Sequence, residues 1–256
     1  MNVLCDLDGV IYRGGTALPG VPDALRRLLD SDFRVFFITN NSTRTPEATA
    51  AKVTEVTGVE VSGDQILTSS QAAMTMLGPA DGPVFVVGEV GLRDSITAHG
   101  LELTDDPTAA HSVVVGLTRS LTYQLLTEAM QAILNGARFI ATNDDTSFPT
   151  EDGLAPGCGA IVAAIAASSA TEPEVAGKPN PAMRELIRSK LDGPTWIIGD
   201  RADTDIALAA GEGDWRSILV LTGITGRESA REAGADHVVE DFPAAVDLVL
   251  RPSQQS

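Results

Sequence analysis

Short apolar segments alternate with longer amphipathic segments along most of the chain. Seven of the short segments, rich in β-branched and aromatic residues, are predicted to be strands: Val3–Leu7, Arg34–Thr39, Val84–Val87, Ser112–Gly116, Arg138–Ala141, Thr195–Gly199 and Ser217–Leu221. Between the first two, apolar residues recur at helical spacing, and the stretch Thr122–Asn135 shows the same pattern. Near-continuous apolar strands are typical of a sheet covered by helices on both faces. The pattern therefore predicts an α/β protein with a mostly parallel sheet.

The chain of 256 residues, 43% of them apolar, is long enough for one large domain or two smaller ones. No apolar run approaches the roughly 18–20 residues that span a bilayer. The first residues lack the basic segment of a signal peptide. Cys5 and Cys158 form neither a disulfide framework nor a CxxC metal site. We expect a cytoplasmic protein without membrane partners.

Acidic residues outnumber basic ones, 35 to 18, which gives a formal net charge of −17. A surface of this charge repels nucleic acids and anionic membranes. We therefore expect no nucleic-acid partner.

Polar residues follow three of the predicted strands. They are Asp6 and Asp8 after the apolar run Val3–Cys5, Thr39 and Asn40 after the run Val35–Ile38, and Asp200 and Asp205 after the strand at 195–199. Ligands bind at the carboxyl ends of parallel strands in open α/β sheets, so these residues are expected to share one end of the sheet.

Converging carboxylates need a cation between them. Two unit charges about 4 Å apart interact by roughly 4 kcal/mol at an effective dielectric near 20. A set of oxygen ligands without His or Cys suits Mg²⁺. Lys178, in the segment AGKPNP, is expected to neutralise an anion beside this cluster. In the DxD pair, the first Asp is suited to attack phosphorus and the second to act as general acid and base.

Four motifs at these positions make the sequence resemble the haloacid dehalogenase (HAD) superfamily of phosphatases. They are DLDGV at Asp6–Val10, ITNNS around Thr39, GKPNP around Lys178 and GDRADTD at Gly199–Asp205. The TNN and GKP variants, with ATNDDTSFPTEDGLAPGCGAIV at Ala141–Val162, are similar to the NagD-like, p-nitrophenylphosphatase branch. The resemblance implies a Rossmann-like core of residues 1–78 and 177–256, with an inserted α/β cap domain at 79–176. Caps of this branch often mediate dimers, so a homodimer is an expected assembly.

The resemblance also implies a role for each motif residue. Asp6 is the expected nucleophile and a Mg²⁺ ligand, and Asp8 is the expected general acid and base, binding Mg²⁺ through its carbonyl oxygen. Asp200 is expected to bind Mg²⁺ directly, and Asp205 as an outer or water-mediated ligand.

Thr39 and Asn40 are expected to hold the phosphoryl group, while Lys178 offsets charge around the nucleophile. Relatives often carry VVGLD where this chain reads VVVGLTR, with Thr118 in place of the acid. Because of that departure, the resemblance does not identify the substrate. Candidate substrate-contacting residues of the cap are Arg119, Asn143 and Asp145.

The sequence thus predicts Mg²⁺-dependent hydrolysis of small organic phosphate monoesters through an aspartyl-phosphate. The partner is a small phosphorylated metabolite, such as a nucleotide, pyridoxal phosphate, phosphoglycolate or glycerol phosphate. One alternative is a receiver-like phosphoacceptor module, although a receiver is about half this length and usually has adjacent acidic residues. Another is a sugar-phosphate mutase on the same core, although such mutases typically carry a smaller helical cap after the first motif.

Overall fold

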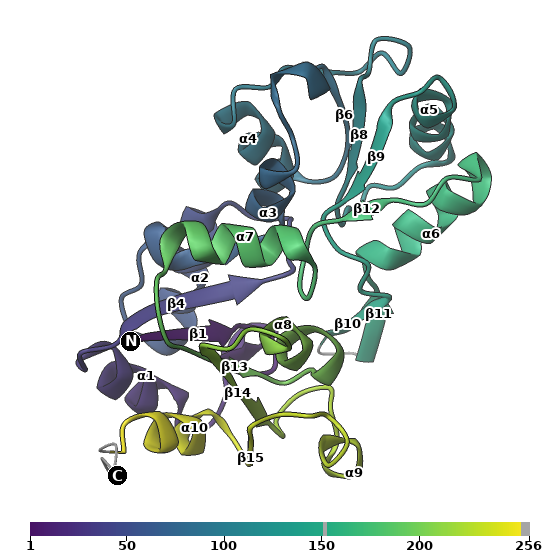
Figure 1. The fold of residues 1–256 in the computed structure, drawn as a ribbon. Helices are drawn as coiled ribbons and strands as arrows, with labels where there is room; N and C mark the ends of the chain where they lie inside the picture. Colours follow the sequence, from purple (N-terminus) through teal and green to yellow (C-terminus); the bar gives the residue numbers. More distant parts are fainter. Residues whose placement is uncertain (151–152, 252–256) are drawn as a thin grey trace. The chain divides into compact units, whose positions relative to one another are not determined.

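The protein is described by a computed structural model, which covers residues 1–150 and 153–251. The chain forms two compact units, each built on one sheet. The six-stranded unit comprises Met1–Ile38, Thr49–Ile66 and Lys190–Ser256, and the five-stranded unit comprises Thr39–Ala48 and Leu67–Ser189. Figure 1 labels the helices and strands of both units.

The sheet of the six-stranded unit has the strand order β15-β14-β13-β1-β4-β5. Its strands are β1 (Asn2–Asp6), β4 (Arg34–Thr39), β5 (Ile66–Thr68), β13 (Thr195–Gly199), β14 (Trp215–Val220) and β15 (His237–Val239). β1 is central and pairs in parallel with both β13 and β4, so that Cys5 lies opposite Ile198 and Phe37. The carboxyl ends of β1 and β13 are therefore adjacent.

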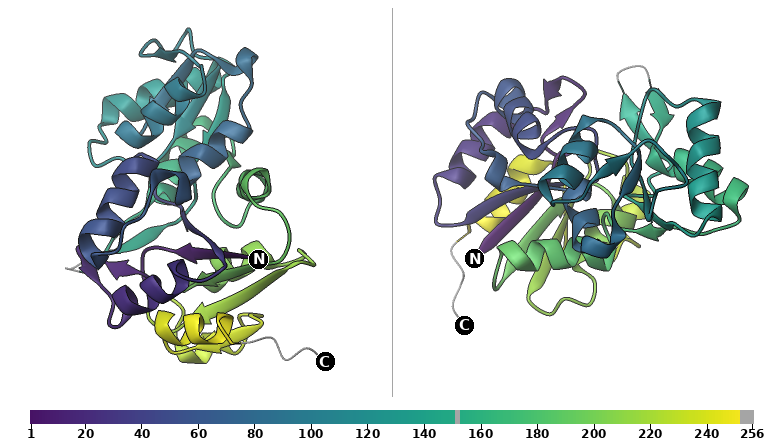
Figure 2. Two further views of the ribbon diagram at one scale, coloured as in Figure 1. Left: turned by 90° about the vertical axis from the view of Figure 1, so that its left-hand side faces the viewer. Right: turned by 90° about the horizontal axis from the view of Figure 1, so that it is seen from above.

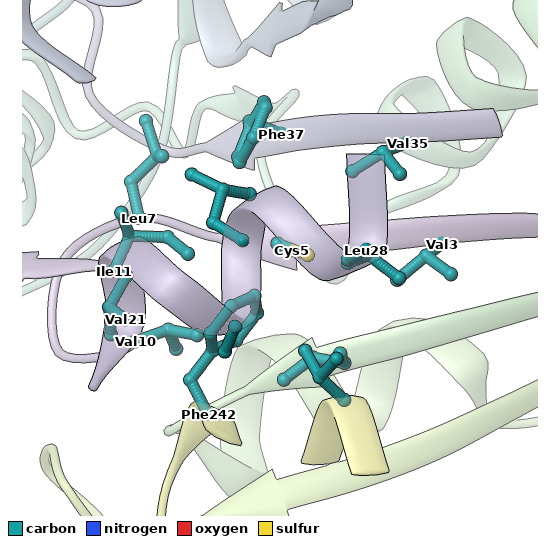
Figure 3. Packing of buried hydrophobic residues seen from close by; sticks show 14 of the residues in the cluster. Val3, Cys5, Leu7, Val10, Ile11, Val21, Leu28, Val35, Phe37 and Phe242 are labelled. Carbon is teal, nitrogen blue, oxygen red and sulfur yellow. The ribbon is translucent and has the colours of Figure 1, made fainter. Parts of the chain in front are cut away.

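Helices α1 (Val21–Leu29) and α10 (Phe242–Val249) pack beside each other in this unit. Figure 3 shows part of the apolar core of this unit, a cluster that includes Leu28 of α1, Phe242 of α10, Val3 of β1 and Phe37 of β4. All four side chains are buried. The remaining elements are β2 (Tyr12–Arg13), β3 (Thr16–Ala17), α2 (Pro46–Thr57), η1 (Gly63–Gln65), η3 (Ala202–Ile206), α8 (Ala207–Ala209) and α9 (Arg227–Ala230).

The sheet of the five-stranded unit has the order β12-β9-β8-β6-β7, and all its pairs are parallel. Its strands are β6 (Val84–Val87), β7 (Leu103–Thr104), β8 (Ser112–Val115), β9 (Arg138–Ala141) and β12 (Glu174–Val175). Helices α5 (Tyr123–Leu134) and α6 (Cys158–Ser169) cover one face and α4 (Val90–Ala98) covers the other (Figures 1 and 2). The unit also contains α3 (Ser69–Thr75), η2 (Pro79–Asp81), the hairpin β10 (Ser147–Thr150) and β11 (Gly153–Pro156), and α7 (Pro181–Lys190), whose last residue belongs to the other unit.

The predicted α/β class with parallel sheets is confirmed, and several predicted strands match the structure at both ends. Three strand predictions need correction. The strand expected at Ser112–Gly116 ends one residue earlier, at Val115. The first strand ends at Asp6 rather than Leu7, because the carbonyl oxygen of Leu7 accepts hydrogen bonds from the amides of the turn that follows, including Ile11 N–H at 2.9 Å. The strand expected at Ser217–Leu221 begins at Trp215, which pairs with Thr195, and ends at Val220.

The segment Thr39–Ala48 leaves β4 and is bonded within the five-stranded unit. Ser42 accepts a hydrogen bond from the Leu117 amide at 3.3 Å, and Thr43 accepts one from the Gly91 amide at 3.2 Å. All five strands of that unit's sheet lie inside residues 79–176, the range expected for the cap. The predicted domain limits stay a prediction. Among the described residues, no helix is both long enough and apolar enough to cross a membrane.

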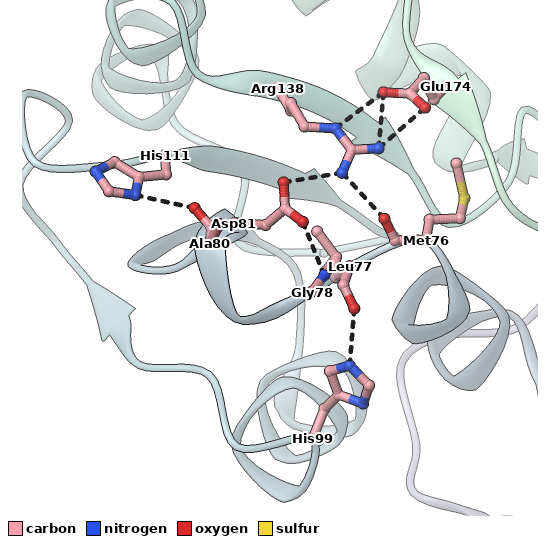
Figure 4. Close-up of polar contacts among 9 residues, drawn as sticks. All are labelled: Met76, Leu77, Gly78, Ala80, Asp81, His99, His111, Arg138 and Glu174. Carbon is pink, nitrogen blue, oxygen red and sulfur yellow. Dashed lines mark hydrogen bonds and ion pairs between the residues drawn. The ribbon is translucent and has the colours of Figure 1, made fainter.

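One arginine binds residues near both ends of the segment 79–176. Arg138 donates hydrogen bonds to Asp81 at 2.9 Å and to the carbonyl oxygen of Met76 at 3.0 Å (Figure 4). It also donates to both carboxylate oxygens of Glu174 at 3.0 Å. The hydrogen bond from Arg138 holds the pKa of Asp81 below its usual value, with further help from the Gly78 amide. These contacts attach η2 to β9 and add a side-chain link between β9 and its neighbour β12.

Candidate active site

Three carboxylates of the six-stranded unit converge at the carboxyl ends of β1 and β13. Asp6 is the last residue of β1, Asp200 follows β13 directly, and Asp205 lies in η3. Each offers one carboxylate oxygen, and these oxygens lie within 4.8 Å of one another. The three residues are at most 7% exposed. The pairing of β1 with β13 thus brings together three of the four expected metal-binding residues.

Asp205 is held by the backbone of the loop that follows β13. Its carboxylate accepts hydrogen bonds from the amides of Asp200 at 3.2 Å and Arg201 at 3.1 Å. The loop winds into a π-helix, η3, in which the Ile206 amide donates to the Arg201 carbonyl. A Cβ atom on Gly199 would overlap the Asp205 side chain, so this close approach requires glycine.

Asp200 is enclosed by a loop that the sequence analysis did not assign to the site, residues 222–225 after β14. The amide of Ile224 donates to the Asp200 carboxylate at 2.7 Å. A Cβ atom on Gly223 would overlap the same carboxyl group. The signal available in the sequence was Gly223 in LTGITG, shortly after the predicted strand Ser217–Leu221.

Asp8 lies in the turn after β1 and is half-buried. Gly9 permits this turn with a φ of +87°, and its amide donates to the Tyr12 carbonyl at 2.9 Å. The hydroxyl of Thr222 donates to the Gly9 carbonyl at 2.6 Å, so the loop 222–225 supports this turn as well as Asp200. The carboxylate of Asp8 is not part of the group formed by Asp6, Asp200 and Asp205. Its expected metal contact through the carbonyl oxygen stays a prediction.

Cys5 precedes the first carboxylate but is not suited to be a nucleophile. Its side chain is fully buried, and burial raises the pKa of its thiol well above the usual value. The negative charge of Asp6 raises that pKa further. The thiol is therefore protonated at neutral pH and packs as a small apolar group.

A second polar group lies in the five-stranded unit, around Asn40 and Lys178. Both residues are buried, 8% and 3% exposed. The Asn40 side chain accepts a hydrogen bond from the Lys178 amide at 2.8 Å and donates one to the Lys178 carbonyl at 3.3 Å. Thr39, at the end of β4, is 4% exposed, and its hydroxyl oxygen accepts from the Asn41 amide at 3.1 Å.

Two of the three candidate substrate-contacting residues bind to Asn40. Asn143 is 3% exposed and donates to the Asn40 carbonyl at 2.7 Å. Asp145 accepts a hydrogen bond from the side-chain amide of Asn40 at 3.1 Å. The structure therefore brings Asn40, Asn143, Asp145 and Lys178 together in one hydrogen-bonded group, in which Asp145 is half-buried and the other three are buried.

The third candidate, Arg119, lies elsewhere in the five-stranded unit. Its side chain is 65% exposed, pairs with Glu89 at 3.3 Å and lies over the ring of Phe148 at 5.9 Å. It lines a pocket of about 450 Å³ together with Leu117, Thr118, Leu121, Phe148, Ala155, Pro156, Gly157, Ala160 and Ile161. This pocket is mostly apolar, with one cationic side chain.

The donor set of the acidic group fits a hard divalent cation. All its ligand atoms are carboxylate oxygens, the type that Mg²⁺ and Ca²⁺ take. Three buried carboxylates so close together repel one another unless positive charge lies among them.

Two family models match the chain. Residues 3–102 match the model of haloacid dehalogenase-like hydrolases, and residues 175–245 match a second HAD-like hydrolase model. The protein belongs to the haloacid dehalogenase family of hydrolases. The family and the enzyme class predicted from the sequence, a phosphatase of the NagD-like branch, are confirmed.

Named relatives of this HAD protein are phosphatases. It is 35% identical to an acid sugar phosphatase of Staphylococcus saprophyticus over 88% of each chain. The crystal structure of p-nitrophenyl phosphatase from Archaeoglobus fulgidus is 33% identical, with a TM-score of 0.87, over 96% of this chain and 98% of that one. A glycerol phosphate phosphatase from Mycobacterium tuberculosis, in complex with magnesium, is 34% identical with a TM-score of 0.86, over 94% of this chain and 74% of that one.

Proposed function

We propose that this protein hydrolyses small organic phosphate monoesters with the help of Mg²⁺, through an aspartyl-phosphate on Asp6. The observation that carries the proposal is the group of three buried carboxylates at the ends of β1 and β13. The magnesium complex of the M. tuberculosis relative supports the choice of metal.

In this proposal Asp6 and Asp200 bind Mg²⁺ through carboxylate oxygens, and Asp8 binds it through its carbonyl oxygen. Asp205 acts as an outer ligand, because the backbone amides of residues 200 and 201 already hold one of its oxygens. Bound Mg²⁺ offsets the negative charge of the carboxylates and of the phosphoryl oxygens.

The first step is attack by a carboxylate oxygen of Asp6 on phosphorus. A bond forms between that oxygen and phosphorus, and the bond from phosphorus to the ester oxygen breaks. Asp8, protonated at this stage, donates its proton to the departing ester oxygen and releases the alcohol.

The second step regenerates the enzyme. The Asp8 carboxylate now takes a proton from water, and the water oxygen attacks phosphorus. The bond between phosphorus and Asp6 breaks, which releases inorganic phosphate and restores the Asp6 carboxylate.

Thr39, Asn40 and Lys178 are proposed to bind the phosphoryl group. The hydroxyl of Thr39 and the ammonium group of Lys178 are suited to phosphoryl oxygens. The side-chain amide of Asn40 is bonded to Lys178 and Asp145, so we assign its contribution to its backbone amide.

Residues 79–176 are proposed to select among substrates, since the phosphoryl group is common to all of them. The pocket beside Arg119 is the feature of this segment best suited to contact an organic group, because it is mostly apolar with one cation at its edge. The homodimer stays an expectation drawn from the resemblance.

The proposal is tested by measuring phosphate release from a panel of phosphorylated metabolites with Mg²⁺. Asp205→Asn is expected to lower turnover of every substrate strongly. Its matched control is Asp203→Asn, which removes the same charge from the same loop at an exposed ion pair with Arg201. Equal activity of the two variants, or no phosphate release by the wild-type protein, would contradict the proposal.

A further inference from the structure

The geometry points to Asp145 and Asn143 as positioning residues, which hold Asn40 so that its side chain fixes the backbone of Lys178. This inference rests on the role of Lys178 in the proposed function. It assigns the two residues an effect on every substrate alike, rather than a contact with the variable part of one substrate.

Asn40 bonds to both backbone polar groups of Lys178. Its amide oxygen accepts from the Lys178 N–H at 2.8 Å, and its amide nitrogen donates to the Lys178 carbonyl at 3.3 Å. An amide side chain carries donor and acceptor on two separate atoms, so it can bond to an N–H and a carbonyl at once. An aspartate at position 40 would keep the first bond, lose the second and face the carboxylate of Asp145.

Asp145 determines which way the Asn40 side chain points, and Asn143 holds the backbone of Asn40. The Asp145 carboxylate accepts the second hydrogen of the Asn40 amide nitrogen at 3.1 Å, which places the amide oxygen toward the Lys178 N–H. Asn143 donates to the Asn40 carbonyl at 2.7 Å, and its own side-chain oxygen accepts from the Asp145 amide at 3.2 Å. Residues from the loop after β9 thus orient a residue that follows β4.

The loop that carries Asp145 is itself fixed to the start of α6. The Gly157 amide donates to the Thr146 carbonyl at 2.9 Å, and the Gly159 amide donates to the Asp145 carbonyl at 2.9 Å. Cβ atoms at both glycines would overlap backbone atoms of this loop. Asp145 is therefore held in place independently of Asn40.

Gly177, the residue before Lys178, packs tightly against the Asn40 side chain. A Cβ atom on Gly177 would lie 2.6 Å from the Asn40 amide oxygen and 2.6 Å from the Thr142 carbonyl. The glycine of the GKP motif therefore admits Asn40 to the Lys178 backbone. Buried amides and carbonyls lose free energy when left unpaired, so removal of Asp145 is expected to let the Asn40 side chain rotate and the Lys178 segment shift.

The test compares Asp145→Ala with Asp145→Asn. The asparagine variant keeps an acceptor oxygen of the same shape for Asn40 but has no charge, whereas alanine removes the acceptor. Asp144→Ala is the matched control, because it removes the charge of an exposed neighbour in the same loop. The measurements are kcat and KM for four phosphate esters, together with hydrogen exchange of the Lys178 amide by mass spectrometry.

Asp145→Ala is expected to lower kcat by about tenfold to 100-fold, by one common factor for all esters, as a shift of a positioned group does. It should also speed exchange at Lys178, while Asp145→Asn and Asp144→Ala stay near wild type in both measurements. Equal loss in Asp145→Asn, unequal factors among esters, or unchanged exchange in Asp145→Ala would overturn the inference. Because exchange does not depend on turnover, an inactive wild-type protein would contradict the proposed function without removing this test.

Discussion

The carboxyl group of Asp200 lies against the backbone of Gly223, so closely that a Cβ atom at position 223 would overlap it. The next residue, Ile224, donates its amide hydrogen to the same carboxylate at 2.7 Å. The loop after β14 thus helps to position the Asp200 side chain through its backbone atoms.

Gly223→Ala is expected to displace the Asp200 carboxylate and to lower turnover by roughly 100-fold, the effect of a small shift in a reacting group. The overlap should also destabilise the protein by about 1–3 kcal/mol. Gly213→Ala is the control, since a Cβ atom there meets open space. The measurements are kcat/KM and the free energy of unfolding, and two variants of equal activity would contradict this account of Asp200.

The acidic group should couple metal binding to stability. Mutual repulsion among Asp6, Asp200 and Asp205 is relieved by a bound cation, so Mg²⁺ is expected to raise the melting temperature of the wild-type protein. EDTA should abolish turnover, and Ca²⁺ should inhibit because its looser coordination disturbs the attacking oxygen. Asp200→Asn should melt at a temperature that Mg²⁺ no longer raises. Full turnover in EDTA would exclude a metal-dependent reaction.

The pair of Arg138 with Asp81 is expected to make a pH-dependent contribution to the free energy of unfolding. The hydrogen bond from Arg138 lowers the pKa of Asp81 from the ordinary value of 3.8, so the contribution is complete above that value and is lost as pH falls through the lowered pKa. Arg138→Met is expected to cost about 1–3 kcal/mol at neutral pH, the range for a hydrogen bond to a charged group. The difference from wild type should shrink below pH 3.8.

Denaturant unfolding across this pH range measures the effect. Arg93→Met is the control, because the pair of Arg93 with Asp105 is long, at 3.9 Å, and exposed. A difference between Arg138→Met and wild type that stays constant with pH would show that Asp81 does not contribute.

Arg119→Ala should change the ranking of natural substrates, because Arg119 is the cation at the pocket of the five-stranded unit. The effect on p-nitrophenyl phosphate, which offers no polar group to that side chain beyond the nitro group, should be slight. The measurement is kcat/KM for five phosphate esters, with Arg93→Ala as control. If Arg119→Ala lowered kcat/KM by the same factor for all five esters, Arg119 would have a structural role only.

The pattern of apolar and polar residues along the chain was sufficient to predict the buried strands of this fold. The strand Arg34–Thr39 was predicted at its observed ends, because its apolar run Val35–Ile38 is almost entirely buried and lies between the polar residues Arg34 and Thr39. Asp6 and Asp200 were expected together because parallel neighbouring strands end side by side. The short edge strands β12 and β15 were missed, since two or three half-exposed residues carry little apolar signal.

The contacts of the site residues were not predictable in the same way. Asn40 was expected to hold phosphate, and nothing local shows that its side chain would bond to Lys178, 138 positions away. The contribution of Gly223 depends on how β14 lies against β13, which is set by the whole sheet. Such partners are fixed by packing between distant segments.

The central claim, an aspartyl-phosphate on Asp6, is tested most directly by a burst experiment on Asp8→Asn. In the proposed mechanism this variant lacks the base that activates water, but p-nitrophenolate leaves readily without a proton. Mixing it with p-nitrophenyl phosphate and Mg²⁺ should release one p-nitrophenolate per enzyme rapidly and further product slowly, with the phosphoryl group found on the peptide containing Asp6 after acid quench. Steady release without a burst, or a phosphoryl group on another residue, would contradict the mechanism.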